Sequence, residues 1–297
     1  MSSRRQFLGA LAATQLVQAL PHAAETAPPR PPSPGSGELC VVTYNLRFAA
    51  STGANAWPTR RPVMKALLDD LKPDVLGTQE GVYAQLKDIA ADQPELDWIG
   101  LGRDGGSRGE FMAIFYRRDR LEPLEYDHFW LSDTPLVMGS STWGNTNRRM
   151  VSWIRFRDRT TQREFYFWNT HLDHALQPAR EKAASLILEQ IRATAKPSLP
   201  LLLVGDFNAV SGDNPVYHQL VKTGGLLDTW HAAAVRRQEQ MNSFNGFEPA
   251  KAEGKRIDWI LSRNPVQVRA TEVITFSRNE QWPSDHFPVV AWLTFGQ

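Results

Sequence analysis

The stretch LLLVGDFNAV, residues 201–210, begins as an apolar strand and ends in polar side chains. Its run of Leu and Val predicts a strand that is buried on both faces. The run then enters Gly-Asp-Phe-Asn, so a carboxylate at Asp206 and an amide at Asn208 stand at the exit of the strand. Asp and Asn also open ordinary turns, so a shared site is indicated only if other strands end in the same way.

Other apolar runs along the chain do end in the same way. Asn45 ends CVVTYN, Glu80 ends DVLGTQE, His171 and Asp173 end FYFWNTHLD, Asp258 lies in RIDWIL, and Asp285 and His286 precede FPVVAWL. Any one of these residues can be a helix cap or a turn residue. Strand ends that gather on one rim would instead converge on a single pocket.

The residue types at these strand ends suit the hydrolysis of a phosphoester. Carboxylate and amide oxygens are hard ligands of the kind that Mg²⁺ prefers, and Mn²⁺ is an alternative. Zinc is less suitable, because the chain has one Cys and no HExxH motif. A metal would polarise the phosphoryl oxygen, and a carboxylate or a His–Asp pair would orient the attacking water.

Strand-like runs outnumber helical segments from residue 38 onward. The clear helical segments are residues 59–71, 83–92 and 178–195. Many strands with few helices, too apolar to be solvated on one face, predict two sheets packed face to face and flanked by helices. No internal repeat or interior linker is visible, so we expect residues 38–297 to form one catalytic domain and the protein to be a monomer.

The N-terminal 24 residues have the layout of an export signal. Arg4-Arg5 precede an apolar stretch over 7–20, and small residues that suit cleavage follow. The pattern Ser-Arg-Arg-x-Phe-Leu resembles the twin-arginine motif, so we expect export, already folded, to the periplasm or the extracellular space. An ordinary secretion signal and an uncleaved anchor are the alternatives. Residues 25–37 predict a mobile Pro-rich linker, and no membrane span is expected once the signal is removed.

The amino-acid composition and net charge limit the kinds of partner that the chain can bind. The chain has 297 residues, 42% of them hydrophobic and 22% charged, which is typical of a globular protein with ample core. The formal net charge of +1 provides no long-range attraction for nucleic acid. Cys40 is the only cysteine, so no intrachain disulfide can form, and its apolar run predicts a buried strand residue.

Six segments together carry a resemblance to a known group of enzymes. In order they are TYNLR, TQE, NTHLDH, GDFN, RIDWIL and SDHFPV. Their order and spacing resemble the endonuclease/exonuclease/phosphatase superfamily, which includes DNase I-like nucleases, exonuclease III-like repair enzymes and inositol polyphosphate 5-phosphatases. The resemblance runs from about residue 39 to 295. It implies an α/β fold, a four-layer α/β/β/α sandwich with two mainly antiparallel sheets.

The resemblance also implies roles for the matched residues. Glu80 would be the principal metal ligand, with Asn45 beside it and Asp285 adding a carboxylate. Asp206 would orient or deprotonate the attacking water, and Asn208 would hold that water and the phosphate. His286, fixed by Asp258, would contact the phosphoryl group, and His171 would stabilise its negative charge. Members of the superfamily differ over whether the aspartate or the His–Asp pair is the base, and Asp285 could instead cap a turn.

Other residues are weaker candidates for substrate binding. Asp173 and His174 could reach the substrate, or Asp173 could shape its loop. Arg148 and Arg149 could grip an anionic group, although a solvated turn explains at least one of them. Glu110 could bind a polar substrate or belong to a flexible Gly-rich connection, and Trp143 could stack on a base, a sugar or a lipid head group.

The substrate class stays open between alternatives. We expect a small phosphoester such as a phosphorylated sugar, an inositol, a lipid head group or a nucleotide. A secreted DNA or RNA nuclease is the alternative, which the near-zero charge and the lack of a dense basic run disfavour. A non-catalytic binding protein on the same scaffold is disfavoured by the intact set of polar residues.

Overall fold

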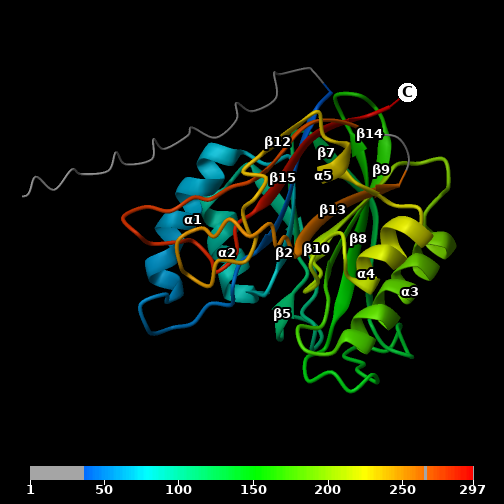
Figure 1. Cartoon of the computed structure of the whole chain (residues 1–297), viewed down its shortest axis with the longest axis horizontal. Helices are drawn as coiled ribbons and strands as arrows, with labels where there is room; N and C mark the ends of the chain where they lie inside the picture. Colours follow the sequence, from blue (N-terminus) through cyan, green and yellow to red (C-terminus); the bar gives the residue numbers. More distant parts are fainter. Residues whose placement is uncertain (1–36, 264–265, 297) are drawn as a thin grey trace, which may run out of the picture.

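A computed structural model describes residues 37–263 and 266–296 of the chain (Figure 1). The predicted signal, residues 1–24, lies outside the described residues, as does nearly all of the predicted linker. Among the residues that are described, no helix is both long enough and apolar enough to cross a bilayer.

Two large sheets form the centre of the molecule. The first sheet has the strand order β12 (Val235–Arg237), β14 (Val266–Val273), β15 (Val289–Phe295), β1 (Leu39–Asn45), β2 (Val75–Gln79), β6 (Ile114–Arg117) and β4 (Leu96–Ile99). The second has the order β11 (Leu227–Asp228), β13 (Asp258–Arg263), β10 (Leu201–Asp206), β9 (Glu164–His171), β8 (Met150–Asp158) and β7 (Leu121–Trp130). Most neighbours are antiparallel, and the pairs β1–β2, β9–β10 and β12–β14 are parallel.

Helices cover the outer faces of both sheets. Helices α1 (Trp57–Leu71) and α2 (Tyr83–Asp92) lie on one side of the molecule, and α3 (Gln177–Thr194) lies on the other (Figure 1). The apolar faces of α1 and α3 are buried against the sheets, as their predicted periodicity requires. The predicted four-layer α/β/β/α sandwich is therefore confirmed.

The continuous apolar run in β10 follows from its place in this sandwich. Leu201 and Leu203 belong to the core beneath α3, whereas Leu202 and Val204 belong to the core between the two sheets. Both faces of the strand are dry, so the alternation of polar and apolar residues expected of a half-solvated strand is absent. The predicted burial of Cys40 in β1 is also confirmed.

Several short elements were not predicted. They are β3 (Gly81–Val82) and β5 (Glu110–Phe111), which pair with each other, β11 and β12, α4 (Pro215–Tyr217), a π-helical turn at His218–Thr223 and α5 (Thr229–Ala232). Segments of two to six residues are too short to display a hydrophobic period. Their backbones take their form from neighbouring strands and caps, such as the Asn214 side chain that accepts from the N–H of Val216.

Candidate active site

The polar strand ends meet at one rim of the sandwich. Parallel pairing of β9 and β10 sets His171 opposite Asp206, and antiparallel pairing of β10 and β13 sets Asp206 opposite Asp258. In the other sheet, parallel pairing of β1 and β2 sets Asn45 opposite Gln79, the residue before Glu80. The amide of Asn45 joins the two sheets, because its Nδ2 donates to Glu80 Oε1 at 3.1 Å and to Asp206 Oδ2 at 3.0 Å.

Gly205 allows β10 to lie this close to β9 at the rim. A Cβ atom at position 205 would stand 2.2 Å from the carbonyl oxygen of Thr170. Any other residue would therefore push the two strands apart one residue before Asp206. The glycine in Gly-Asp-Phe-Asn thus serves a close approach of backbones.

Asp206, Asp258 and His286 form a buried acid–imidazole cluster. Nδ1 of His286 lies 3.0 Å from Asp258 Oδ2, and its Nε2 lies 3.7 Å from Asp206 Oδ2. Burial, followed by the charge of Asp258, raises the pKa of Asp206 to about 7. Burial alone would lower the pKa of His286, but Asp258 and Asp206 outweigh it and raise that pKa to about 10. The cluster thus pairs a cationic imidazole with a carboxyl group that titrates near neutral pH.

His171 stays neutral beside this cluster. Burial, together with the charges of Arg149 and His286, holds the pKa of His171 well below its usual range. The Nδ2 amide of Asn208 donates to His171 Nε2 at 3.0 Å and to the carbonyl of Leu172 at 3.1 Å. The imidazole that the resemblance assigns to charge stabilisation is therefore held by Asn208 as a neutral ring.

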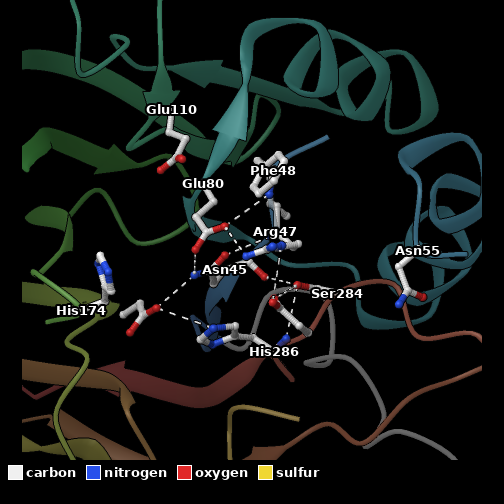
Figure 2. Close-up of polar contacts among 12 residues, drawn as sticks. Asn45, Arg47, Phe48, Asn55, Glu80, Glu110, His174, Ser284 and His286 are labelled. Atoms are coloured by element: carbon white, nitrogen blue, oxygen red, sulfur yellow. Dashed lines mark hydrogen bonds and ion pairs between the residues drawn. The ribbon is translucent and has the colours of Figure 1, made fainter. Parts of the chain in front are cut away.

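A second polar group centres on Glu80. Arg47 lies between two carboxylates, with Nη1 at 3.8 Å from Glu80 Oε2 and Nε at 3.6 Å from Asp285 Oδ2. Figure 2 shows Glu80, Asn45, Arg47 and His286 in one connected set of polar contacts, with Glu110 and His174 standing apart from it. Burial raises the pKa of Asp285, and His286 opposes that rise.

Backbone conformation also marks this region. Arg47, Glu80 and Asn208 have positive φ angles of 52°, 62° and 48°, in the left-handed region that non-glycine residues seldom occupy. Three such residues at one site indicate that the surrounding structure holds side chains in set directions at a cost in local conformational energy.

A cavity of about 430 Å³ opens onto these groups. Of the predicted site residues, those that line it are Glu80, Glu110, Arg149, His171, His174, Asp206, Asn208, Asp285 and His286. Asn45 and Asp258 lie fully buried behind that lining and hold Glu80, Asp206 and His286 from the rear. The sandwich therefore brings the whole core set together.

Three of the weaker candidates lie outside this cavity, because partners close to each of them hold its side chain. Asp173 Oδ1 accepts from the N–H groups of Ala175 and Leu176, which gives it the loop-shaping role. Arg148 forms an ion pair with Asp104, and Trp143 donates to Asp133. None of these three is among the described residues that line the cavity.

Arg149 is the most unusual cation of the lining. Its side chain is buried, yet Nε and Nη1 have no hydrogen-bond partner among the residues that the structure describes. Within residues 37–263 and 266–296, the only hydrogen bond of its side chain joins Nη2 to Nδ1 of His174, at 3.3 Å. A buried guanidinium without a carboxylate partner is costly unless an anion completes it.

Sequence reasoning missed several residues of the lining. Arg47, Phe48, Arg103, Asn147 and Phe244 all face the cavity. Arg47 stands inside the quoted segment TYNLR, and that position was the available signal for it. The others come from loops, and which of their side chains face the cavity depends on the rest of the fold.

The donor set fits a divalent cation. Asp206, Asp258 and His286 each place one ligand atom within 4.8 Å of one another. His286 is the weakest member of that trio, because Asp258 and Asp206 hold it protonated. Glu80 and Asp285 instead face a common positive group, the Arg47 guanidinium, with hard carboxylate oxygens. The residues that would hold a metal are therefore Glu80 and Asp285, with Asn45 beside them.

The chain belongs to the endonuclease/exonuclease/phosphatase family, whose model matches residues 42–286. Members of this family hydrolyse phosphoester bonds and depend on divalent metals, so the chain is a phosphoester hydrolase. The predicted reaction class is confirmed.

Solved structures from bacteria are similar over most of the chain. An endonuclease/exonuclease/phosphatase family protein from Bacteroides thetaiotaomicron is 37% identical with a TM-score of 0.81, covering 88% of this chain and 98% of that one. A mannosyl-6-phosphatase from the same organism is 37% identical with a TM-score of 0.80, covering 86% and 100%. The catalytic domain of human Nocturnin has the same fold at 17% identity and a TM-score of 0.68, covering 88% of this chain and 95% of that one.

A curated relative extends beyond the matched region. Protein angel of Drosophila melanogaster is 24% identical over 182 residues, which cover 59% of this chain. The chain spans about half the length of that relative.

Proposed function

We propose that this protein is a Mg²⁺-dependent phosphomonoesterase that acts on a small phosphorylated sugar. The observation that carries the proposal is the cavity of about 430 Å³, which the catalytic candidates line together with Arg149. Nε and Nη1 of this guanidinium have no partner among the described residues. That volume suits one sugar phosphate. The similarity to a mannosyl-6-phosphatase at 37% identity supports the same substrate class.

The chemistry required is attack of water on phosphorus. Asp206 accepts the proton of that water, and a carboxyl pKa of about 7 suits a base that works near neutral pH. His286 is kept cationic by Asp258 and lies beside Asp206, where it stabilises negative charge on the phosphoryl oxygens. Arg149 contributes further N–H groups toward the anion, and its fork geometry matches phosphate oxygens.

Mg²⁺ bound by Glu80 and Asp285 would supply the Lewis acid that polarises the phosphoryl group. Carboxylates with few protein ligands suit Mg²⁺, which usually keeps several waters. Arg47 already neutralises the two carboxylates in part, so the cation would share them with this guanidinium.

The proposal includes export by the twin-arginine route. Its support is the Ser-Arg-Arg-x-Phe-Leu pattern, followed by the apolar stretch over 7–20. Fractionation of cells that express the full chain tests it, with Arg4→Lys and Arg5→Lys combined as the variant. Retention of that variant in the cytoplasm is expected, and equal export of both proteins would refute the twin-arginine route.

A substrate screen tests the proposed activity. Sugar phosphates, p-nitrophenyl phosphate, bis-p-nitrophenyl phosphate and single-stranded DNA are offered with Mg²⁺ and again with EDTA. We expect the monoesters to release phosphate in the presence of Mg²⁺ and not in EDTA, and we expect little cleavage of DNA. If DNA were cleaved and the monoesters were not hydrolysed, the nuclease alternative would be established instead.

Metal binding has its own measurement. Mg²⁺ should raise the melting temperature of the wild-type protein, because a ligand that binds only the folded state stabilises it. Glu80→Gln should lose most of this rise and most activity. A full Mg²⁺-dependent rise in Glu80→Gln would show that the metal binds elsewhere.

A further inference from the structure

One wall of the cavity carries polar groups that the proposed chemistry does not use. Arg103 Nη1 donates to Glu110 Oε2 at 2.6 Å, and its Nη2 donates to Asn147 Oδ1 at 3.2 Å. All three residues line the cavity. The side chains of Arg103 and Glu110 are 14% and 17% exposed, so the pair is largely removed from bulk water but open to the cavity.

The pairing of β3 with β5 places this wall next to Glu80, one of the residues that would hold the metal. Val82 pairs with Glu110, so Glu110 stands across from the chain that has just left Glu80. Figure 2 shows Glu110 on the Glu80 side of the site, with none of the drawn contacts joining it to that cluster. Glu110 therefore faces the cavity near the reaction centre without belonging to it.

Backbone contacts hold this loop in addition to the ion pair. The backbone N–H of Arg103 donates to the carbonyl of Glu110 at 2.9 Å, and Trp130 Nε1 donates to the carbonyl of Arg103 at 2.8 Å. Gly102 lets the loop close on itself, because a Cβ there would stand 2.0 Å from the carbonyl oxygen of Arg108. With the backbone held in this way, the two side chains are free to serve a ligand.

The pair leaves hydrogen-bonding capacity toward the cavity. Within the described part of the chain, Oε1 of Glu110 accepts no hydrogen bond, and Nδ2 of Asn147 donates none. The rim of the cavity also has two aromatic rings, Phe48 and Phe244, which are 38% and 48% exposed. Acceptors, donors and exposed rings that line one cavity are the groups that bind hydroxyls and the apolar face of a sugar.

We propose that Glu110, Arg103 and Asn147 form a subsite that binds hydroxyl groups of the sugar and thereby selects sugar phosphates over other monoesters. This inference rests on the proposed function and adds the source of its specificity. Glu110 accepts from the sugar hydroxyls, and Arg103 and Asn147 keep its carboxylate in place and donate to the same or the neighbouring hydroxyl. The reacting phosphoryl group is bound by Asp206, His286 and Arg149, which leaves Glu110, Arg103 and Asn147 available to the sugar.

Kinetics on two substrates test the subsite. Glu110→Gln should raise KM about 10-fold or more for the best hexose phosphate, because a site built to bind hydroxyls loses a charged acceptor. With p-nitrophenyl phosphate, which has no hydroxyl, kcat/KM should change less than about twofold. Glu125→Gln is the matched control, since Glu125 is also a strand glutamate paired with an arginine, Arg155, and lies outside the cavity.

Deoxy analogues of the hexose phosphate provide a second readout that needs no variant. The wild-type enzyme should lose affinity for the analogue that lacks the bound hydroxyl, and Glu110→Gln should be indifferent to that loss. Arg103→Lys, which keeps the charge but not the fork, should give an intermediate KM.

The outcomes separate this inference from the proposed function. Equal losses on both substrates in Glu110→Gln would overturn the subsite and place Glu110 in the reaction itself. A wild-type enzyme that hydrolyses p-nitrophenyl phosphate but discriminates against no deoxy sugar would also overturn it, with the phosphatase activity intact. A wild-type enzyme inert to every monoester would refute the proposed function and the subsite together.

Discussion

At the scale of the residue, the site depends on burying ionisable groups until only a small part of each side chain remains exposed. Asp206, Asp258 and His286 are 1%, 0% and 5% exposed. Burial disfavours charge, so each group relies on another for compensation, and the imidazole between two carboxylates provides it. The result is a carboxyl group whose pKa of about 7 suits proton transfer.

Asp206→Asn should lower kcat by about 10²-fold or more, because it removes a proton acceptor and preserves the side-chain shape. Steady-state hydrolysis of p-nitrophenyl phosphate measures the effect. Asp119→Asn, an exposed partner of Arg117, is the control and should leave kcat unchanged. A kcat within twofold of wild type in Asp206→Asn would assign the base to another group.

His128, which is not among the residues that line the cavity, links the stability of the fold to pH. Burial lowers its pKa from 6.5 to about 4, against a rise caused by Asp127. Its Nδ1 lies 2.8 Å from Ser152 Oγ. Because the folded pKa is depressed, the unfolded chain binds more protons below pH 6.5, and stability is lost as the pH falls from there toward 4.

Between about pH 7 and pH 5, the half-buried His128 should lower the free energy of unfolding by about 1–2 kcal/mol. Urea unfolding at the two pH values measures this loss. His128→Gln should lose that much less than wild type, whereas His231→Gln, at an exposed position, should behave as wild type. Parallel losses in all three proteins would show that His128 does not titrate in this way.

At the scale of the element, helix α1 holds together the two loops that carry Arg47 and Asp285. Arg60 is fully buried and donates to five backbone carbonyls, those of Leu46, Arg47, Phe48, Asn55 and Pro283. Those carbonyls belong to the loop after β1 and to the segment that leads to Asp285. One guanidinium therefore holds both sides of the region around Glu80.

Arg60→Lys should lower the free energy of unfolding by about 2–4 kcal/mol, because an ammonium cannot reach all of these carbonyls and leaves buried acceptors unpaired. Activity should fall as well, since Arg47 and Asp285 would move. Arg61→Lys is the matched control on the same helix, where a half-exposed arginine pairs with Asp88 and Asp92. Its change should stay below about 1 kcal/mol, and equal losses in the two variants would contradict the role given to Arg60.

At the scale of the whole molecule, two sheets from distant parts of the chain each supply half of the site. Beneath the rim they are joined by buried amides, with Gln79 Nε2 donating to Asn169 Oδ1 at 2.7 Å and Asn169 Nδ2 donating to the carbonyl of Thr78 at 2.8 Å. These polar contacts cross the otherwise apolar interior between the sheets. They set the spacing at which Asn45 of one sheet reaches Asp206 of the other.

The near-zero net charge leads to a weak dependence on salt. With a small substrate, kcat/KM should change by less than about threefold between roughly 50 and 200 mM NaCl, because few counterions are released on binding. An enzyme that grips several nucleic-acid phosphates would lose about 10³-fold or more over that range. Stopped assays at constant Mg²⁺ measure the ratio, and a steep loss would favour a polyanionic substrate.

The sequence alone determined the sandwich and its polar rim. Three features were visible in the sequence: the continuous apolar run of β10, the many strands with few helices, and the polar residues at the ends of several strands. They were visible because hydrophobicity and its period are local properties of a chain. The same pattern placed Asn45, Glu80, His171, Asp206, Asn208, Asp258 and His286 in one candidate set. Their convergence needed only that the strand ends share one rim.

Only the tertiary structure decided which of the remaining polar residues face the cavity. Arg148 and Arg149 are neighbours in sequence, yet one pairs with Asp104 at the surface and the other is buried in the lining. Arg103 meets Glu110 because a Gly-rich loop closes on itself, and Arg60 meets Pro283 across more than two hundred residues. Such contacts depend on loop closure and on the packing of distant segments, which no local pattern of side chains encodes.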